Sequence, residues 1–198
     1  MPTEQVVAGS IPARRMNFRV VSARPERTLY YQGNIHMIQE GAKILRDTGK
    51  IFMQEALKEA DKAFDEDEVP VGAVIVYKGR VISRAHNQVE RLKDPTAHAE
   101  MLAITAAANY LGNKWLLDTS LYVTVEPCSM CAGSLVLARI KNLYFGASDP
   151  KTGACGSIFN ILSNKKLNHR IKVKGGILKE ECSFLLKDFF KKKRAVIN

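Results

Sequence analysis

Apolar residues recur along this chain at two spacings, and each spacing predicts a different kind of element. Over residues 38–64 they return every three or four positions, which is the period of an amphipathic helix. The acidic stretch 65–68 and then Pro70 end that pattern. Residues 69–87 instead form two β-rich runs around a Lys-Gly pair, which predicts a β-hairpin.

Beyond the hairpin, β-rich runs alternate with segments of helical period. Thr96 is expected to be the N-cap of the first of these helices. The further strands are predicted at 120–127, 141–148 and 169–176, and the further helices at 97–109, 128–140, 157–163 and 178–195. Strands that alternate with helices after a hairpin predict a three-layer α/β/α domain with a mixed five-stranded sheet.

The composition fits one folded domain with an added N-terminal arm. The chain has 198 residues, of which 46% are hydrophobic and 25% are charged, as in ordinary globular proteins. No apolar run reaches the roughly 18 residues that a membrane span needs, so no membrane partner is expected. Residues 1–36 contain five Arg and two Glu but neither Lys nor Asp. We therefore expect a disordered or non-native extension at 1–36 and the functional domain at 37–198.

The expected location in the cell depends on this extension. It contains no continuous apolar stretch of the kind found in secretory signal peptides. Its Arg-rich, acid-poor composition is compatible with an organellar transit peptide, and a native start at Met37 or Met53 fits as well. We expect a cytoplasmic protein, with an organellar location as the alternative.

The net charge of +10 is concentrated near the C-terminus. Residues 164–198 contain 11 Lys and Arg against three Asp and Glu, whereas residues 37–163 contain 14 against 15. A basic segment of this density attracts polyanions, of which nucleic acid is the commonest. The alternative is a solvated helix face whose lysines are favoured by the negative end of the helix dipole.

Two short segments carry the clearest chemistry, and each lies at the start of a predicted helix. One contains His98 and Glu100, and the other is the run Pro-Cys-Ser-Met-Cys with Cys128 and Cys131. Two cysteines three positions apart present both sulfur atoms on one helix face. A helix N-terminus lowers the pKa of a thiol, which favours the thiolate that a metal ion requires.

His98, Cys128 and Cys131 thus make a set of three candidate metal ligands. Two thiolates and an imidazole favour zinc, and three protein ligands leave the fourth tetrahedral position open for water. That open position distinguishes a catalytic zinc site from a structural one. Glu100 lies two residues after His98, about 200° around a helix, so it is badly placed as a second ligand and suits proton transfer instead.

Two other interpretations of the cysteine pair stay open on this motif alone. A redox-active C-x-x-C needs no His-x-Glu partner, and a structural zinc site would need a fourth ligand. The residues that could supply a fourth ligand, none of them at motif-like spacing, are His86, Cys155, His169 and Cys182. We expect Cys155 and Cys182 to be small buried hydrophobic residues instead.

The order of these motifs resembles that of the bacterial tRNA-specific adenosine deaminases, whose zinc signature is H-x-E followed by P-C-x-x-C. The matching blocks are EVPVGAVIV (68–76), HN (86–87), DPTAHAEMLAI (94–104), LYVTVEPCSMCAGS (121–134), FGASDPKTGACGS (145–157), NHR (168–170) and DFFKKKR (188–194). The first four blocks also fit other cytidine deaminase-like enzymes, and the last three favour a tRNA substrate. The resemblance implies a cytidine deaminase-like fold.

The resemblance also implies a role for each matching residue. His98, Cys128 and Cys131 would bind one Zn²⁺ per subunit, and Glu100 would transfer protons. The residues implied in substrate binding are Asn87 at the flipped nucleoside, Asp149 and Lys151 beside the anticodon nucleotides, and Phe189 and Phe190 near the loop. At least one of the two phenylalanines is expected to be mainly structural, as a core residue at a helix end.

The implied substrate is the wobble adenosine of an arginine tRNA, which the family converts to inosine. Its members are homodimers that contact the tRNA anticodon stem-loop with both subunits. The chemistry is consistent, because attack at adenine C6 requires an activated water and the base must first be extruded from its stack. Aromatic and cationic groups, which splayed RNA loops require, occur together in the run 189–194.

Two other functions stay possible at this point. A zinc-dependent deaminase of a free nucleobase or nucleotide, of the cytosine, guanine or dCMP type, would use the same site but would leave the basic C-terminus without a role. An inactive subunit that only binds tRNA would commonly lack the proton-transferring glutamate, whereas Glu100 is present.

Overall fold

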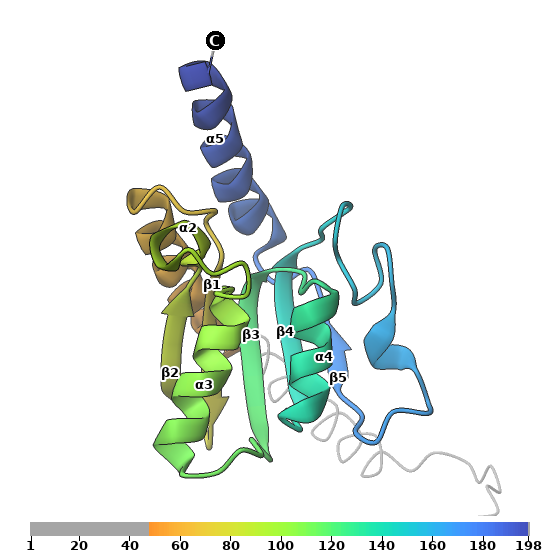
Figure 1. The fold of residues 1–198 in the computed structure, drawn as a ribbon. Coiled ribbons are helices and arrows are strands. Elements are labelled where there is room, and N and C mark those ends of the chain that lie inside the picture. Colours follow the sequence, from red (N-terminus) through yellow and green to blue (C-terminus); the bar gives the residue numbers. More distant parts are fainter. Residues whose placement is uncertain (1–47, 198) are drawn as a thin grey trace, which may run out of the picture. The chain divides into compact units, whose positions relative to one another are not determined.

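Five strands form one mixed sheet in the computed structural model, which describes residues 48–197 (Figure 1). The strands are β1 (Gly72–Tyr77), β2 (Arg80–His86), β3 (Thr119–Val125), β4 (Asn142–Ala147) and β5 (Lys172–Lys174). Their order is β2-β1-β3-β4-β5, with β1 antiparallel to both neighbours and β3, β4 and β5 parallel to one another. The predicted mixed five-stranded sheet is confirmed. The predicted extension at 1–36 lies outside the described residues, so its boundary stays a prediction.

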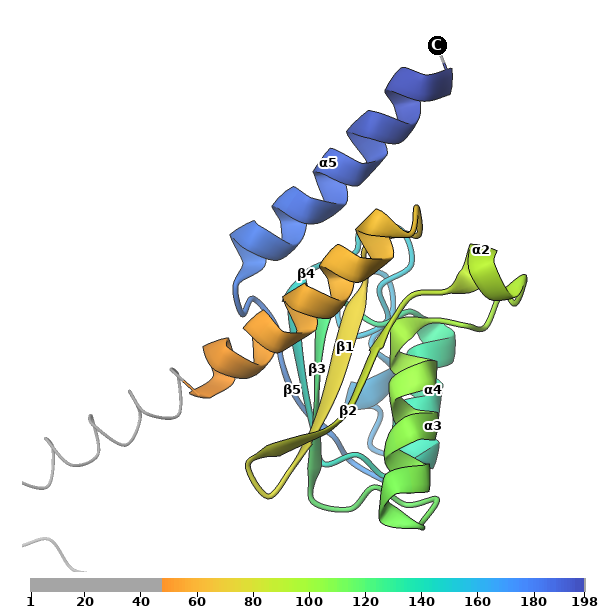
Figure 2. The same ribbon diagram turned by 90° about the vertical axis from the view of Figure 1, so that its left-hand side faces the viewer.

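Helices cover both faces of this sheet (Figure 2). α3 (Ala99–Leu111) and α4 (Ser129–Leu137) lie on one face, and the helix over residues 48–65 lies with α5 (Lys179–Ile197) on the other. Two short elements, α2 (Val89–Leu92) and the 3₁₀ helix η1 (Ile161–Ser163), complete the set. The three-layer α/β/α arrangement is therefore as predicted. Within the described part of the chain, no helix has the length and apolar character that crossing a membrane requires.

The hairpin between β1 and β2 turns where the sequence predicts it. Lys78 and Gly79 both have positive φ angles, of 48° and 74°. Two consecutive residues with positive φ make a tight turn whose twist matches that of the flanking strands, and glycine adopts this conformation without strain. The two strands pair antiparallel on either side of this turn.

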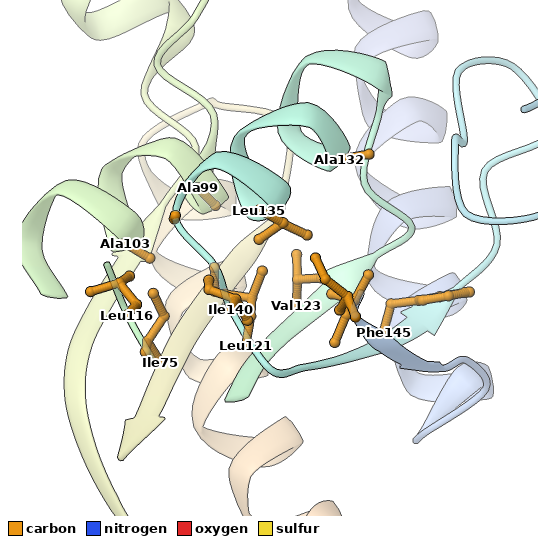
Figure 3. Close-up of a cluster of buried hydrophobic side chains, with 14 of the residues drawn as sticks. Ile75, Ala99, Ala103, Leu116, Leu121, Val123, Ala132, Leu135, Ile140 and Phe145 are labelled. Atoms are coloured by element: carbon orange, nitrogen blue, oxygen red, sulfur yellow. The ribbon is translucent and has the colours of Figure 1, made fainter. Parts of the chain in front are cut away.

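The larger core lies between the sheet and helices α3 and α4. Ile75, Leu121 and Val123 project from the central strands and pack with Ala103 and Leu135 of the two helices (Figure 3). Because successive strand residues point to opposite faces, these side chains all lie on the same side of the sheet. The small side chains of α3 let this helix pack close to the strands, which fixes where its first turn lies.

The opposite face has a second, smaller core. Tyr122 packs there with Met53 and with Cys182 of α5. Cys182 is the small buried residue that the sequence predicts, and burial raises the pKa of its thiol to about 12. At Gly72 an added Cβ atom would lie under 3.0 Å from backbone atoms of the helix over 48–65, so only glycine lets β1 pass this helix so closely.

The predicted N-cap of the α3 helix is wrong. The backbone N–H and hydroxyl of Thr96 donate to Asp94 Oδ1, at 2.8 and 2.7 Å, and so close a local turn. Because this turn uses the Thr96 hydroxyl, Thr96 does not cap the helix, which begins at Ala99. His98 then occupies the N-cap position, with φ −69° and ψ 151°.

Three smaller differences concern irregular segments. α2 forms between the predicted hairpin and the predicted helix at 97–109, where no helix is predicted. The predicted helix at 157–163 is only the 3₁₀ turn η1, and the predicted strand at 169–176 is only β5. The helix at 157–163 does not form because the surrounding loop uses its backbone donors. In a helix the N–H of Ile161 would donate to the Ser157 carbonyl oxygen, but it donates instead to the Ala154 carbonyl oxygen at 3.0 Å.

The strand directions bring three distant segments to one edge of the sheet. β2, β3 and β4 run the same way, so their C-terminal ends lie along that edge. Asn87 follows β2, Cys128 follows β3 and Asp149 follows β4. The carboxyl ends of strands in open α/β sheets are the usual place for a binding crevice.

Candidate functional site

His98, Cys128 and Cys131 come together at this edge, as their spacing predicts. His98 Nδ1 lies 3.7 Å from Cys128 Sγ and 3.5 Å from Cys131 Sγ, and the three donor atoms lie within 4.8 Å of one another. Tetrahedral zinc, with Zn–S bonds of about 2.3 Å and Zn–N bonds of about 2.0 Å, separates its donor atoms by roughly 3.5–3.8 Å. The three residues therefore fit a zinc ion in both donor type and spacing.

Helix starts position all three donors. His98 is the N-cap of α3, Cys128 is the N-cap of α4, and Cys131 lies in the first turn of α4. A hydrogen bond from the Cys131 thiol, with a further contribution from His98, lowers the pKa of Cys128 to about 4. Cys128 is thus a thiolate at neutral pH, which is the form that coordinates metal ions.

No fourth protein ligand joins this group within residues 48–197. The four residues considered above as a possible fourth ligand lie elsewhere: His86 contacts Glu66, His169 contacts the Ile140 carbonyl oxygen, and neither Cys155 nor Cys182 belongs to the group. Catalytic zinc sites have three protein ligands and an open fourth coordination position, whereas structural zinc sites have four protein ligands.

Glu100 lies beside this group without belonging to it. Its side chain is 4% exposed, in the first turn of α3, and it lines the same cavity as His98 and Cys128. Burial raises the pKa of the Glu100 carboxyl group. A carboxyl group with a raised pKa, next to a metal-ligand group but not part of it, suits the exchange of protons with a reacting molecule.

A cavity of about 540 Å³ opens above these residues. This volume is within the range of small-molecule sites and is sufficient for a nucleoside. Besides His98, Cys128 and Glu100, the predicted site residues that line it are Asn87, Asp149, Lys151 and Phe190. Phe189 does not line it.

Asn87 is held at the side of the cavity by two contacts. Its backbone N–H donates to the Val71 carbonyl oxygen at 2.9 Å, and its side-chain Nδ2 donates to Glu68 Oε2 at 3.1 Å. Glu68 is buried and also accepts from the backbone N–H of Arg91 at 2.7 Å. Sequence reasoning missed Glu68 because its carboxylate was counted with the acidic stretch that ends the preceding helix.

The Asp149 carboxylate accepts hydrogen bonds from residues of its own loop. It accepts from the backbone N–H of Lys151 at 2.8 Å and from the Thr152 hydroxyl at 2.5 Å. Burial raises the pKa of Asp149, but these hydrogen bonds outweigh burial and hold the pKa below its usual value. Lys151, in contrast, is exposed at the mouth of the cavity.

The two phenylalanines of α5 have different surroundings. Phe189 is 5% exposed and contacts the ring of Phe64 edge-on, with centroids 5.7 Å apart. Phe190 is 43% exposed and lines the cavity. Phe190 also borders a second hollow of about 250 Å³, together with Lys151, Lys187 and Arg194.

Glu126 is a further residue that sequence reasoning missed. It follows β3 directly and is buried, and the neighbouring loop donates several hydrogen bonds to its carboxylate. Burial raises the pKa of Glu126, but the bonds from Ser157, Cys155 and Asp149 outweigh burial and lower it. The sequence does contain one signal for it, because Glu126 is a charged residue at the end of an otherwise mostly apolar predicted strand.

Comparison with known proteins links these residues to one group of enzymes. The family model for MafB19-like deaminases matches residues 47–194. A tRNA-specific adenosine deaminase of Aquifex aeolicus is 56% identical over 143 residues, which are 72% of this chain and 94% of that protein.

Solved structures agree with this result. One from a study of A-to-I editing by tRNA:A34 deaminases at the wobble position matches with a TM-score of 0.66 and 46% identity, over 68% of this chain and 98% of that one. A guanine deaminase of Nitrosomonas europaea matches with a TM-score of 0.60 over 71% of this chain and 83% of that one. At 23% identity the second match shows the fold alone. The predicted cytidine deaminase-like fold is confirmed.

Proposed function

Since this chain belongs to the family of tRNA-specific adenosine deaminases, we propose that it converts adenosine to inosine at the wobble position of a tRNA anticodon, in an arginine tRNA. The observation that carries this proposal is the cluster of His98, Cys128 and Cys131 at a nucleoside-sized cavity, whose floor is lined by His98, Cys128 and the buried Glu100. The overall reaction is adenosine plus water giving inosine plus ammonia.

One Zn²⁺ per subunit, held by His98, Cys128 and Cys131, would activate water for attack at neutral pH. The protein residues do the rest. Glu100 accepts a proton from the attacking water and delivers one to the adenine ring nitrogen as the C6–O bond forms. It then takes the proton of the new C6 hydroxyl group and passes it to the amino group, so that the C6–N bond breaks, ammonia leaves and the C6=O bond of inosine forms. Its burial keeps this proton exchange away from bulk solvent.

The cavity walls hold the nucleoside. Asn87, fixed by Glu68, offers hydrogen-bonding groups to the flipped nucleoside. Phe190 offers an aromatic surface, and Lys151 offers a cation to the RNA backbone. Extrusion of the base from its stack costs a few kcal/mol, which these contacts must offset.

The basic helix α5 favours an RNA substrate over a free nucleobase. Its residues Lys187 and Arg194 share a hollow with Lys151 and Phe190, next to the active-site cavity. A free base or nucleotide would leave this second, cationic hollow without a role. The second candidate, deamination of a cytosine, guanine or dCMP-type small molecule, is favoured by no observation at this site.

Two further proposals rest on the family alone. We propose a homodimer in which the tRNA contacts both subunits, and a cytoplasmic location. Sedimentation of the purified protein with and without an anticodon stem-loop tests the first, and localisation of the tagged protein in cells tests the second.

A competition between substrates tests the proposed activity. Purified protein is incubated with total tRNA, and the tRNA is sequenced for A-to-I changes; free adenine, guanine, cytosine and dCMP are assayed in parallel. Inosine confined to the wobble position of an arginine tRNA is the expected result. Turnover of small molecules only would replace the proposal with the second candidate.

A further inference from the structure

One buried carboxylate at the cavity has no part in the chemistry proposed above. Glu126 is 3% exposed and lies between β3 and the ligand Cys128. Its Oε1 accepts from the backbone N–H groups of Cys155 and Ser157, at 2.9 and 3.0 Å. Its Oε2 accepts from the backbone N–H of Asp149, at 3.2 Å, and from the Ser157 hydroxyl.

These bonds join both ends of one loop, residues 149–157, to a single side chain. The loop also lies close against that side chain at its middle. A Cβ atom added at Gly153 would lie 2.6 Å from the carboxyl carbon of Glu126 and 2.5 Å from the Asp149 carbonyl oxygen. The loop is therefore shaped around the Glu126 carboxylate, while its Ala154 is buried in the larger core.

The same loop forms one wall of the active-site cavity. Asp149, Pro150, Lys151 and Thr152 all line it, and Lys151 also borders the second, cationic hollow. Four donors of the loop already engage both oxygens of Glu126. Glu126 also lines the cavity, but because the loop occupies both of its oxygens, we expect it to act on the substrate through the loop.

We propose that Glu126 is a positioning residue for the RNA substrate. It holds the 149–157 loop in the shape that places Lys151 on the cavity wall, and it thereby sets the affinity for the anticodon without acting on the reacting atoms. This inference rests on the proposed function, because the affinity in question is that for RNA.

The central experiment compares Glu126→Gln with the native chain on an anticodon stem-loop that contains the target adenosine. An amide in place of one carboxylate oxygen sets an N–H group against an N–H donor of the loop, which disorders it. The expected result is a KM raised roughly tenfold with kcat within about twofold of the native value, since charged hydrogen bonds are lost. Zinc content is expected to stay at one per subunit.

A matched control is Glu59→Gln, another buried glutamate, which bonds Lys62 on the helix over 48–65 and does not line the cavity. It is expected to leave KM unchanged.

A double-mutant cycle of Glu126→Gln with Lys151→Ala then tests whether Glu126 affects KM through Lys151. If Glu126 acts through Lys151, the Glu126→Gln effect on KM shrinks in the Lys151→Ala background.

The outcomes separate this inference from the proposed function. A native protein that does not deaminate the stem-loop refutes the function itself. If the native protein is active, three results for Glu126→Gln overturn the inference. An unchanged KM would mean that Glu126 does not affect RNA binding, and a loss of zinc would mean that it supports the segment of Cys128. Effects of Glu126→Gln and Lys151→Ala that simply add would mean that Glu126 does not act through Lys151. If Glu126→Gln does not fold, the test uses Ser157→Ala, which removes only the hydrogen bond from the Ser157 hydroxyl to Glu126. A rise in KM smaller than about tenfold supports the inference, and an unchanged KM overturns it.

Discussion

The floor and the wall of the cavity are built in different ways. The floor, His98, Glu100 and Cys128, lies in the first turns of α3 and α4, which pack on the sheet across the larger core. The wall, residues 149–152 with Phe190, belongs to a loop and to one exposed face of α5. The shape of the loop depends on hydrogen bonds to Glu126, 23 to 31 positions earlier in the chain.

Under the proposed function, we infer that this difference separates the residues of the reaction from the residues that select the substrate. Side chains on packed helices are held firmly, which proton transfer and metal coordination require. Loops tolerate change and can alter what is bound while the scaffold stays the same. Substitutions in the floor should therefore reduce zinc content or kcat, and substitutions in the wall should change the affinity for RNA.

Loss of one of the three candidate metal ligands should have the largest effect. Cys131→Ala removes one of three donors, so zinc content should fall far below one per subunit and deamination should become undetectable. Metal analysis and an inosine assay measure both quantities. Cys155→Ala, a cysteine outside the ligand group, is the control and should keep its zinc. Full activity of Cys131→Ala would mean that the reaction does not use this group.

Glu100→Gln should have the next largest effect, and on kcat alone. The amide has the same size but cannot exchange protons, so kcat should fall between about 10²-fold and 10⁴-fold. Zinc content and KM for the stem-loop should stay near their native values, because Glu100 belongs to neither the ligand group nor the wall. A rise in KM with an unchanged kcat would place Glu100 in substrate binding instead.

The floor could be predicted from the sequence, and the wall could be predicted only in part. His98, Cys128 and Cys131 are close because short motifs place each at a helix start, and a motif of this kind is visible in the sequence itself. Even there the helix start was misplaced, since the Asp94–Thr96 turn delays α3 by two residues.

The wall depends on contacts between distant residues, which spacing does not show. Nothing in the sequence near Glu126 indicates that its carboxylate binds the backbone of Cys155 and Ser157. The spacing of Cys182, Leu186 and Phe189 does predict that Phe189 lies on the buried face of the last helix. Only the packing of α5, however, shows that Phe189 contacts Phe64 while Phe190 lines the cavity.

Substitutions in the basic run 191–194 of α5 should have an intermediate effect, on the affinity for RNA and its dependence on salt. Lys192 pairs with Asp188 at 3.2 Å and Lys193 pairs with Asp67 at 2.5 Å. No ion pair within residues 48–197 involves the exposed Lys191 or Arg194, and Arg194 borders the cationic hollow.

A matched pair of double variants uses this contrast. Lys191→Ala with Arg194→Ala should weaken stem-loop binding and reduce the slope of log K against log salt by about 1 to 2, since each lost phosphate contact removes about 0.7 to 0.9. Lys192→Ala with Lys193→Ala should change the slope less, because these cations are already paired. Equal slopes for both pairs would show that only the total charge of α5 matters. Binding titrations at several salt concentrations provide the measurement.

The smallest effect concerns Asp149, whose carboxylate stabilises the wall itself. The folded-state pKa of Asp149 is held below its usual value by Thr152 and Lys151, against the effect of burial. The ionised carboxylate therefore stabilises the fold at pH values above the unfolded pKa, about 3.9, and this contribution is lost as pH falls through the lower folded pKa.

Asp149→Asn should accordingly lower the free energy of unfolding by about 1 kcal/mol at pH 7, because an amide is a weaker acceptor for two hydrogen bonds. The difference from the native chain should persist down to about pH 5 and shrink below about pH 4, where the native carboxylate becomes protonated as well. Urea unfolding at a series of pH values gives this difference directly. A difference that is the same at pH 3 and pH 7 would mean that the charge of Asp149 does not stabilise the loop. The shape of the wall would then depend on Glu126 and on the close packing at Gly153, and the Asp149 carboxylate would be available to contact the RNA.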